Sequence, residues 1–364
     1  MIVDRLQYYM DSCGHISEKQ AGLRRSYNTT EQNVLTQHIK DSFQKKQSTL
    51  GVFVVFKSAF DRRFLSIKYG NSCSGYGQSR QGLPQGSVLS PVLFNIMIND
   101  LLSFIDNAVP EINFLLYADD LVLWPTGSDI PTLESTQNSA LVTLANWSLE
   151  NDFKVNPDKT DFELFTLSTK KHNVNFVYNN HVILRTDCAT YFGISLDSRL
   201  SWTEHIAKVV ENATTRPSLL KRIAGVKWGS SRSVLTSTFT SYIRRVIDYA
   251  SELLVTASDS ALLKLDIVQN KALRFITGAS TSTPIASMGL QTEISSSSER
   301  RQYSALSLGE QLIRKKYFWP YKHLPKQDLK LNILSCLSSR DSQMFLMFPI
   351  IDFPSLDRLP YRVI

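Results

Sequence analysis

The first half of the chain alternates short apolar runs with turn residues, which is typical of strands. Val52–Phe56 is a five-residue run of branched and aromatic side chains, and it predicts a buried strand. Phe114–Tyr117 and Leu121–Trp124 flank the short acidic stretch Ala118-Asp119-Asp120. Two apolar runs around such a turn predict a tight β-hairpin.

Apolar residues at helical spacing predict four helical stretches. The first is centred on Leu35 and Ile39. Ser90-Pro91 opens the second, with Ser90 as N-cap and Pro91 at the first helical position. Its expected buried stripe is Val92, Leu93, Ile96 and Met97, with Asn95 and Asn99 on the opposite side.

The third predicted helix ends before the turn Asn156-Pro157-Asp158. Its expected buried stripe consists of Leu133, Gln137, Ala140, Leu141, Leu144 and Trp147. From about Trp202 to Thr277 the pattern is mostly helical, with core positions at Ile206, Val209, Val210, Leu262, Leu265, Val268 and Leu273. The chain is therefore expected to pass from an α+β part to a mostly α part, with a boundary near 197.

Composition fits an ordinary globular protein with a polyanionic partner. The 364 residues are 43% hydrophobic and 20% charged, and the net charge of +7 favours nucleic acid only weakly. The four cysteines have no CxxC spacing, so neither a zinc site nor a disulfide framework is expected. No signal core or run of about 18 apolar residues is present, which predicts a soluble, intracellular protein without a membrane segment.

Asp119 and Asp120 are the strongest candidates for chemistry. Adjacent carboxylates raise each other's pKa unless a cation neutralises them. Their oxygens suit Mg²⁺, and two such ions can support phosphoryl transfer. Taken alone, an Asp-Asp pair is more often a solvated turn, since aspartate is a favoured turn residue.

The neighbouring motifs decide between these interpretations. GLPQGSVLSPVLFNIMINDL (82–101) and LLYADDLVLW (115–124) resemble motifs B and C of reverse transcriptases from jockey-type non-LTR retrotransposons. VNPDKT (155–160) is similar to motif D, YFGISLD (191–197) to the primer grip, and SEKQAGLRRSYNTTEQ (17–32) to part of the fingers. SWTEHI, KRIAGVKWG and LDIVQNKALRFITG, between 201 and 278, resemble the thumb. The resemblance covers roughly 1–310 in family order, which an unrelated basic helical scaffold would match only by accident.

This resemblance implies a right-hand polymerase, an α+β fold with truncated fingers, a palm with an antiparallel sheet and a mostly helical thumb. The expected parts are a remnant of the fingers (1–50), the palm (51–197), the thumb (198–290) and a tail without recognisable RNase H (291–364). The implied partners are an RNA template, a DNA primer and deoxynucleoside triphosphates, with Mg²⁺ as cofactor.

The resemblance also implies catalytic and nucleotide-binding roles. Asp119 and Asp120 match the metal-binding carboxylates of motif C, with Asp119 the better candidate for direct contact. Lys159 matches a proton donor to the leaving pyrophosphate, and a solvated turn lysine is the alternative. Phe60 matches the aromatic residue that excludes a ribose 2′-OH, although phenylalanine near a strand is as often plain core. Gln85 and Gly86 match the motif B loop against the incoming nucleotide, or else form a helix-entry loop.

Primer and template contacts are implied at two further places. Tyr191, Phe192 and Gly193 match the primer grip, and the alternative is a strand leading into the thumb. Arg24 and Arg25 are candidates for contact with template or triphosphate, because guanidinium groups suit phosphate, and the alternative is a charged surface loop.

Two departures from the family pattern predict a partial or degenerate copy. The family has an aspartate five residues before the selecting aromatic, and here that position is Val55, which has no ligand oxygen. Asp61 lies about six residues further along a strand that rises ~3.3 Å per residue, so it cannot replace the lost group. Only about twenty residues separate Asp61 from motif B, fewer than in the family.

These departures predict a polymerase domain without measurable DNA synthesis. The alternative is a non-catalytic remnant that still binds nucleic acid. The start at Met1 falls within the fingers, and no upstream endonuclease domain is recognisable. Both a decayed element copy and a faulty gene model are compatible with this sequence.

Overall fold

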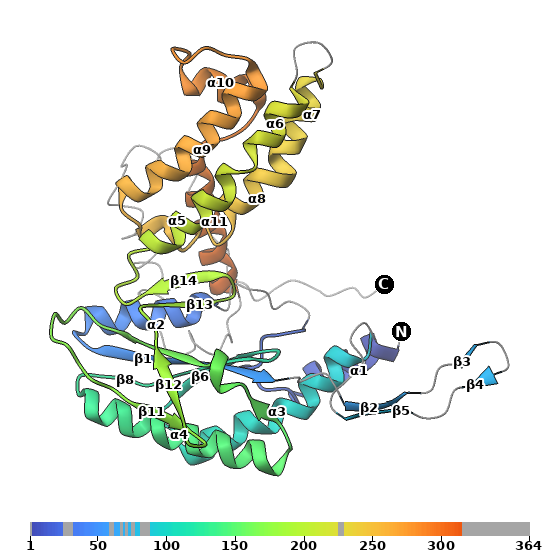
Figure 1. Cartoon of the computed structure of the whole chain (residues 1–364), viewed down its shortest axis with the longest axis vertical. Coiled ribbons are helices and arrows are strands. Elements are labelled where there is room, and N and C mark those ends of the chain that lie inside the picture. Colours follow the sequence, from blue (N-terminus) through green and yellow to red (C-terminus); the bar gives the residue numbers. More distant parts are fainter. Residues whose placement is uncertain are drawn as a thin grey trace, which may run out of the picture. The chain divides into compact units, whose positions relative to one another are not determined.

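The computed structural model describes residues 2–24, 32–57, 62–65, 68–69, 72–73, 77–80, 88–224 and 229–314 (Figure 1). All of these residues belong to one compact unit, Met1–Lys322. The predicted site residues Arg25, Phe60, Gln85 and Gly86 lie outside the described residues, as does Asp61.

An eight-stranded, mostly antiparallel sheet forms the centre of the first half. The order of its main path is β11-β12-β10-β1-β7-β6, and the short strands β8 and β9 also pair with β1. The strands are β1 (Ser48–Lys57), β6 (Asn113–Tyr117), β7 (Asp120–Trp124), β8 (Thr126–Gly127), β9 (Lys154–Val155), β10 (Asp161–Phe165), β11 (Phe176–Tyr178) and β12 (His181–Arg185). The predicted strand at 52–56 and the predicted hairpin around 118–120 are therefore confirmed.

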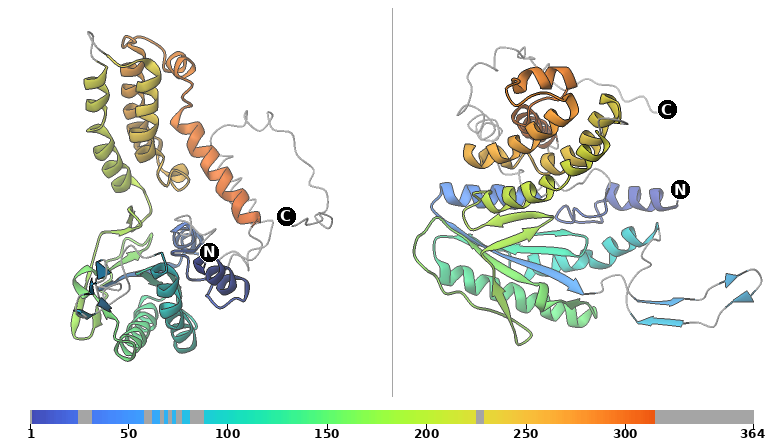
Figure 2. Two further views of the ribbon diagram at one scale, coloured as in Figure 1. Left: turned by 90° about the vertical axis from the view of Figure 1, so that its right-hand side faces the viewer. Right: turned by 45° about the horizontal axis from the view of Figure 1, so that its top comes forward.

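Helices cover both faces of this sheet. Helices α3 (Ser90–Ala108) and α4 (Ile130–Glu150) lie on one face, and α2 (Gln32–Gln44) lies on the other (Figures 1 and 2). Strand β1 contributes side chains to the hydrophobic core on each face of the sheet, because successive side chains of a strand point to opposite faces. Phe53 packs with Leu35 and Ile39 of α2, whereas Val54 belongs to the cluster with α3 and α4.

The predicted stripe of α4 is confirmed, since all six of its residues are buried. For α3 the prediction was partly wrong. Leu93, Ile96 and Met97 are exposed, whereas Asn95 is buried together with Val92 and the residues Phe94, Ile98, Leu101, Leu102 and Ile105. Ser90 is the first helical residue rather than the N-cap, which is Leu89 without a side-chain cap.

The second half is mostly helical, as predicted. A hairpin of β13 (Cys188–Tyr191) and β14 (Ile194–Asp197) leads into it. The helices are α5 (Thr203–Thr214), α6 (Pro217–Ile223), α7 (Arg232–Thr238), α8 (Arg245–Asp248), α9 (Asp259–Thr277), α10 (Ile285–Thr292) and α11 (Ser297–Arg314). Helix α11 continues this body past residue 290, because Arg300 pairs with Asp248 of α8 through Nη2 and Oδ1 at 2.8 Å.

The remaining elements are short or terminal. They are α1 (Ile2–Ser12), the strands β2 (Arg62–Leu65), β3 (Lys68–Tyr69), β4 (Ser72–Cys73) and β5 (Gly77–Arg80), a π-helix at Phe239–Arg244 between α7 and α8, and 3₁₀ turns at Pro157–Lys159 and Leu254–Thr256. Among the described helices, none combines the length and the apolar character needed to cross a membrane.

Candidate functional site

The two candidate carboxylates lie at the turn of the β6–β7 hairpin. Tyr117 pairs with Asp120, so Ala118 and Asp119 form a two-residue turn. Ala118 has a φ of 54°, and Asp119 has no positive φ. A positive φ at the first central position alone is the pattern of a type II′ hairpin turn, which favours glycine there. Alanine in this conformation is strained, and such strain gathers at functional sites.

The environment of the turn disfavours a full negative charge. Burial, together with the negative charge of Asp119, raises the pKa of the Asp120 carboxyl to about 6. Both side chains are partly exposed. Two half-buried carboxylates at one turn therefore form a site that a cation would stabilise.

Val55 lies directly opposite Asp120 in the β1–β7 ladder. Directly opposed residues of an antiparallel pair share one face of the sheet, with their Cβ atoms about 4.5–5.5 Å apart. The partly exposed Val55 side chain thus occupies the position from which a third carboxylate would reach the turn. In the described part of the chain, no group of three or more His, Cys, Asp or Glu side chains could hold a metal ion.

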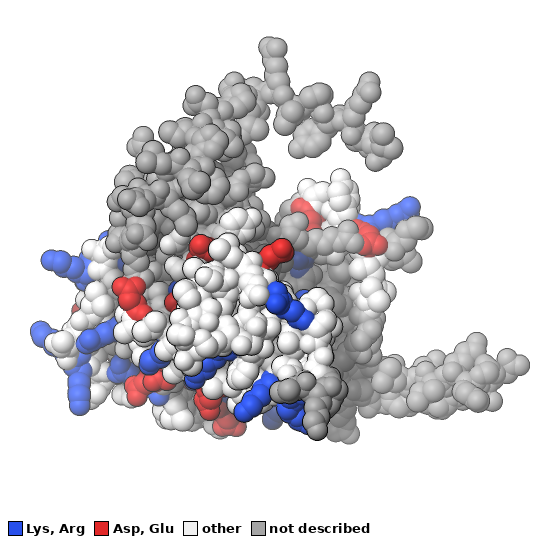
Figure 3. Space-filling model, turned by 90° about the horizontal axis from the view of Figure 1, so that it is seen from above, with Lys and Arg blue, Asp and Glu red and all other residues white. Residues whose placement is uncertain are grey.

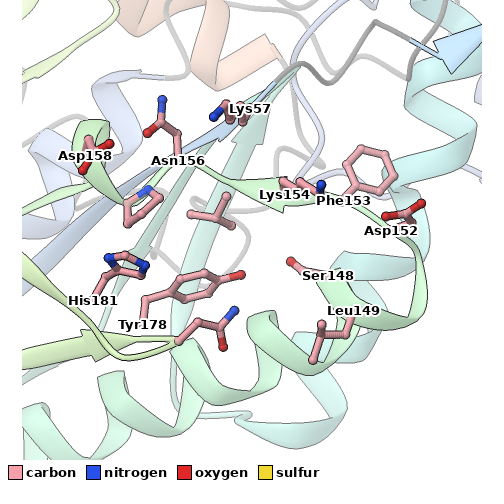
Figure 4. A pocket seen from close by; sticks show the side chains of 13 residues that line it. Lys57, Ser148, Leu149, Asp152, Phe153, Lys154, Asn156, Asp158, Tyr178 and His181 are labelled. Atoms are coloured by element: carbon pink, nitrogen blue, oxygen red, sulfur yellow. The ribbon is translucent and has the colours of Figure 1, made fainter. Parts of the chain in front are cut away.

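The turn that resembles motif D is hydrogen-bonded to the backbone of Val55. The Asn156 N–H donates to the Val55 carbonyl at 2.8 Å, and the Val55 N–H donates to Thr160 Oγ1 at 3.5 Å. Lys159 is exposed on the 3₁₀ turn between these two residues. A cavity of about 420 Å³ lies beside the turn, and Figure 4 shows Lys57 and Asn156 among its lining residues.

The predicted primer-grip residues lie against the hairpin. Phe192 and Gly193 connect β13 to β14 with φ values of 49° and 74°, which is the pattern of a type I′ turn. The Phe192 ring meets the Tyr117 ring edge-on, with centroids 4.5 Å apart, and lies 4.1 Å from the Tyr191 ring. The Tyr249 hydroxyl donates to the Phe192 carbonyl at 2.5 Å, which ties this turn to the helical half. The fold thus brings together the segments that resemble motif C, motif D and the primer grip, with Val55 of β1 among them.

Residues 1–196 match the family described as reverse transcriptase (RNA-dependent DNA polymerase). The match covers more than half of the chain. The chain belongs to the reverse transcriptase family.

Two curated relatives of this chain come from mobile elements. It is 29% identical over 319 residues to the probable RNA-directed DNA polymerase from transposon BS of Drosophila melanogaster, covering 76% of this chain and 34% of the relative. It is 24% identical over 311 residues to the RNA-directed DNA polymerase from mobile element jockey of the same species, covering 77% of this chain and 34% of the relative. The resemblance to jockey-type non-LTR retrotransposons is confirmed, and the chain spans about a third of the length of these relatives.

Among solved structures, the telomerase from Candida tropicalis in complex with a TWJ fragment of telomeric RNA is similar at 12% identity. That match has a TM-score of 0.38 and covers 92% of this chain and 56% of the telomerase chain.

A segment near the N-terminus also contacts the β6–β7 hairpin, and this contact was not predicted from the sequence. We call residues Ser17–Arg24 the brace. Gln20 of the brace forms a parallel bridge with Leu116 of β6, and Gly22 lies against the peptide that joins Tyr117 to Ala118. The glycine of the QAG stretch was the one sequence signal of this contact.

Arg24 was predicted to contact template or triphosphate. In the structure its side chain contacts other residues of the brace and Asp11. Its guanidinium donates to the carbonyls of Ser17 at 2.8 Å and Gln20 at 3.0 Å, and it pairs with Asp11 at 2.8 Å. The side chain is only 6% exposed. A role in binding template remains a prediction, and these contacts supply a structural role.

Basic side chains do not form one continuous patch on the face drawn in Figure 3, where lysine and arginine alternate with aspartate and glutamate. In the helical half, Arg244 is paired with Asp248 at 3.0 Å, which offsets part of its charge. On this face, among the described residues, the cations that could contact phosphates are therefore dispersed rather than gathered into one basic surface.

Proposed function

We propose that this chain is an RNA-directed DNA polymerase domain of a non-LTR mobile element that has kept its fold and lost its nucleotidyl-transfer chemistry. In this proposal residues 51–197 are the palm, 198–290 are the thumb and 1–50 are what remains of the fingers. The observation that carries the proposal is the register of Val55 against Asp120. It supports the alignment that makes Val55 the substitute for the family's bridging aspartate.

The remaining donors do not fit a pair of metal ions. Asp119 and Asp120 offer carboxylate oxygens to one Mg²⁺ ion, but Val55 offers none. Two-metal catalysis depends on ligands that clamp both ions a few ångströms apart. We therefore propose no metal-dependent catalytic step in this chain, and no role for Lys159 as a proton donor.

The proposed partners are an RNA template and a DNA primer, with deoxynucleoside triphosphates as the substrate class of the family. Phe192 and Tyr191 are the candidates for the primer strand, because the Phe192 ring lies against Tyr117 beside the two carboxylates. Gly193 completes the turn that carries Phe192, whose side chain is partly exposed, whereas Tyr191 is buried at 5% exposure. Phe60, Gln85 and Gly86 are proposed to meet the incoming nucleotide, and Arg25 the template.

Binding of a DNA primer annealed to an RNA template tests the proposal. The unaltered chain should bind this duplex, and its affinity should fall at least about tenfold between 50 and 200 mM salt, as counterion release by a few phosphate contacts requires. Fluorescence anisotropy of a labelled primer measures this. Bound complexes given Mg²⁺ and all four deoxynucleotides should leave the primer length unchanged.

Two results would contradict the proposal in different ways. Absent or salt-independent binding would remove the nucleic-acid partner. Template-dependent growth of the primer would show that Val55 does not replace a required ligand. A blunt DNA duplex of equal length and charge is the control for binding that ignores the primer–template junction.

A further inference from the structure

The brace covers the edge of the sheet beside the aspartate turn. Strand β6 is an edge strand, and its Leu116 N–H donates to the Lys19 carbonyl at 3.0 Å. The Ala21 N–H donates in return to the Leu116 carbonyl at 2.9 Å. This short parallel pairing places the next residue, Gly22, at the level of the turn.

At Gly22 two backbones meet with no space for a side chain. A Cβ atom on Gly22 would lie 2.1 Å from the Ala118 nitrogen and 2.7 Å from the Tyr117 carbonyl carbon. Both are backbone atoms, which cannot swing aside as a flexible side chain can. Glycine is therefore required here for close approach of the backbone, which is one of its specific uses.

Asn95 of α3 holds Gly22 in this position. Its Nδ2 donates to the Gly22 carbonyl at 2.9 Å, and its Oδ1 accepts from Gln20 Nε2 at 2.9 Å. Asn95 is 1% exposed and Gln20 is fully buried. A buried amide that is hydrogen-bonded on both sides fixes its neighbours firmly, because breaking either bond leaves a polar group without water.

We propose that Gly22 and Asn95 are positioning residues for Asp119 and Asp120. Through the brace they hold Ala118 in its positive-φ conformation, and the direction of both carboxylates follows from that conformation. Without this contact the strained turn is free to relax. The proposal rests on the proposed function only in treating this turn as the former catalytic site.

Asn99 provides a matched control one helical turn away. Its Oδ1 accepts from the Ser17 N–H at 2.8 Å and its Nδ2 donates to the His15 carbonyl at 3.0 Å. Asn95→Asp and Asn99→Asp each remove one amide donor between α3 and the same segment. Asn95 alone of the two reaches the residue that contacts the turn.

Hydrogen exchange measured by mass spectrometry on the unaltered full chain and both variants tests the proposal. Asn95→Asp should speed exchange in the peptide covering residues 117–121 at least about tenfold, and Asn99→Asp should not, because local opening follows local contacts. Urea unfolding of both variants identifies any shared loss of global stability. Equal rates in the two variants, or an unchanged rate in Asn95→Asp, would overturn the proposal.

Metal affinity gives a second measurement that a merely structural role would not move. In a Val55→Asp background, with Mn²⁺ as the probe, Asn95→Asp should weaken binding about tenfold or more relative to Asn99→Asp, since groups that orient ligands typically contribute that much. Equal Mn²⁺ affinities would count against positioning. A Val55→Asp parent that binds no Mn²⁺ would instead contradict the proposed loss of a ligand, and the exchange rates would still decide the role of the brace.

Gly22→Ala extends the test, with Gly14→Ala as its control. Gly14 has a φ of 66° and open space around its Cβ position, so alanine there adds strain without a clash. Gly22→Ala should speed exchange at residues 117–121, whereas Gly14→Ala should leave that rate unchanged. A folded Gly22→Ala protein with the parent's exchange rate in this peptide would overturn the proposal.

Discussion

Val55→Asp should raise the affinity of the hairpin for Mn²⁺ at least about tenfold, because the number of charged oxygen ligands tunes the affinity of such sites. The new carboxylate would stand opposite Asp120 on the same face of the sheet. Isothermal titration calorimetry of the unaltered chain and the variant measures the change.

The same substitution should make stability depend on the metal. Burial and Asp119 already raise the pKa of Asp120 to about 6, so a third carboxylate adds repulsion when no cation is present. The melting temperature of Val55→Asp should fall in EDTA and recover with Mn²⁺, as expected when a ligand binds only the folded state.

Val55→Asn is the matched control for this prediction. It has nearly the same shape as aspartate and offers one oxygen, but it adds no charge. Its Mn²⁺ affinity should lie close to that of the unaltered chain. Equal affinities for Val55→Asn and Val55→Asp, or no gain in either variant, would contradict the assignment of position 55.

Glu163→Gln should stabilise the protein strongly at alkaline pH. Glu163 of β10 is 1% exposed, and its Oε2 accepts from the Ala189 N–H at 2.9 Å. The pKa of this carboxyl is raised to about 8, and burial is the largest cause. The hydrogen bond from Ala189 and the charge of Arg185 lower the pKa, whereas the charges of Asp197 and Asp187 raise it. The protonated form therefore prevails near neutral pH in the folded protein.

The sign of the pH dependence follows from this raised pKa. The ordinary value is 4.5, so between about pH 4.5 and pH 8 the folded chain holds a proton that the unfolded chain has released. Stability then falls as the pH rises through this window and stays low above it. Because one pKa unit corresponds to about 1.4 kcal/mol and the shift from 4.5 is to about 8, the free energy of unfolding of Glu163→Gln should exceed that of the parent by on the order of 5 kcal/mol at pH 9.

Urea unfolding at pH 5 and pH 9 measures this difference. Glutamine keeps an oxygen that accepts from Ala189, so the gain should be small at pH 5 and large at pH 9. Glu150→Gln, at an exposed position at the end of α4, should leave the pH dependence of the parent unchanged. A parallel pH dependence in Glu163→Gln and its parent would show that Glu163 ionises normally.

Local pattern was enough to predict the elements that carry the site. The hairpin at Asp119 follows from two apolar runs around an acidic turn, and the stripe of α4 follows from helical spacing. Both signals lie within about twenty neighbouring residues, so they do not depend on the rest of the fold.

The contacts that fix the turn could not be predicted in this way. Asn95 was expected on the solvent side of α3, but it is buried because its amide binds Gln20 and Gly22, more than 70 residues earlier in the chain. Leu93, Ile96 and Met97, expected in the core, are exposed. A hydrophobic pattern gives no sign of a polar group that is buried by a distant hydrogen-bond partner.

The pairing of β1 with β7 explains in chemical terms why the residue at position 55 matters for the aspartate turn. Counting residues predicts that Val55 is the substituted position, and the pairing with Asp120 gives a physical reason to expect an effect there. A side chain there faces the turn, and valine has no oxygen to offer a metal ion. In this account family membership persists while one necessary ligand is missing.

Primer extension on an RNA template, with Mg²⁺ and all four deoxynucleotides, tests the central claim most directly. The unaltered chain should add no nucleotide, Val55→Asp should extend the primer, and Val55→Asp combined with Asp119→Asn should again be inactive. Extension by the unaltered chain at the rate of Val55→Asp would contradict the account.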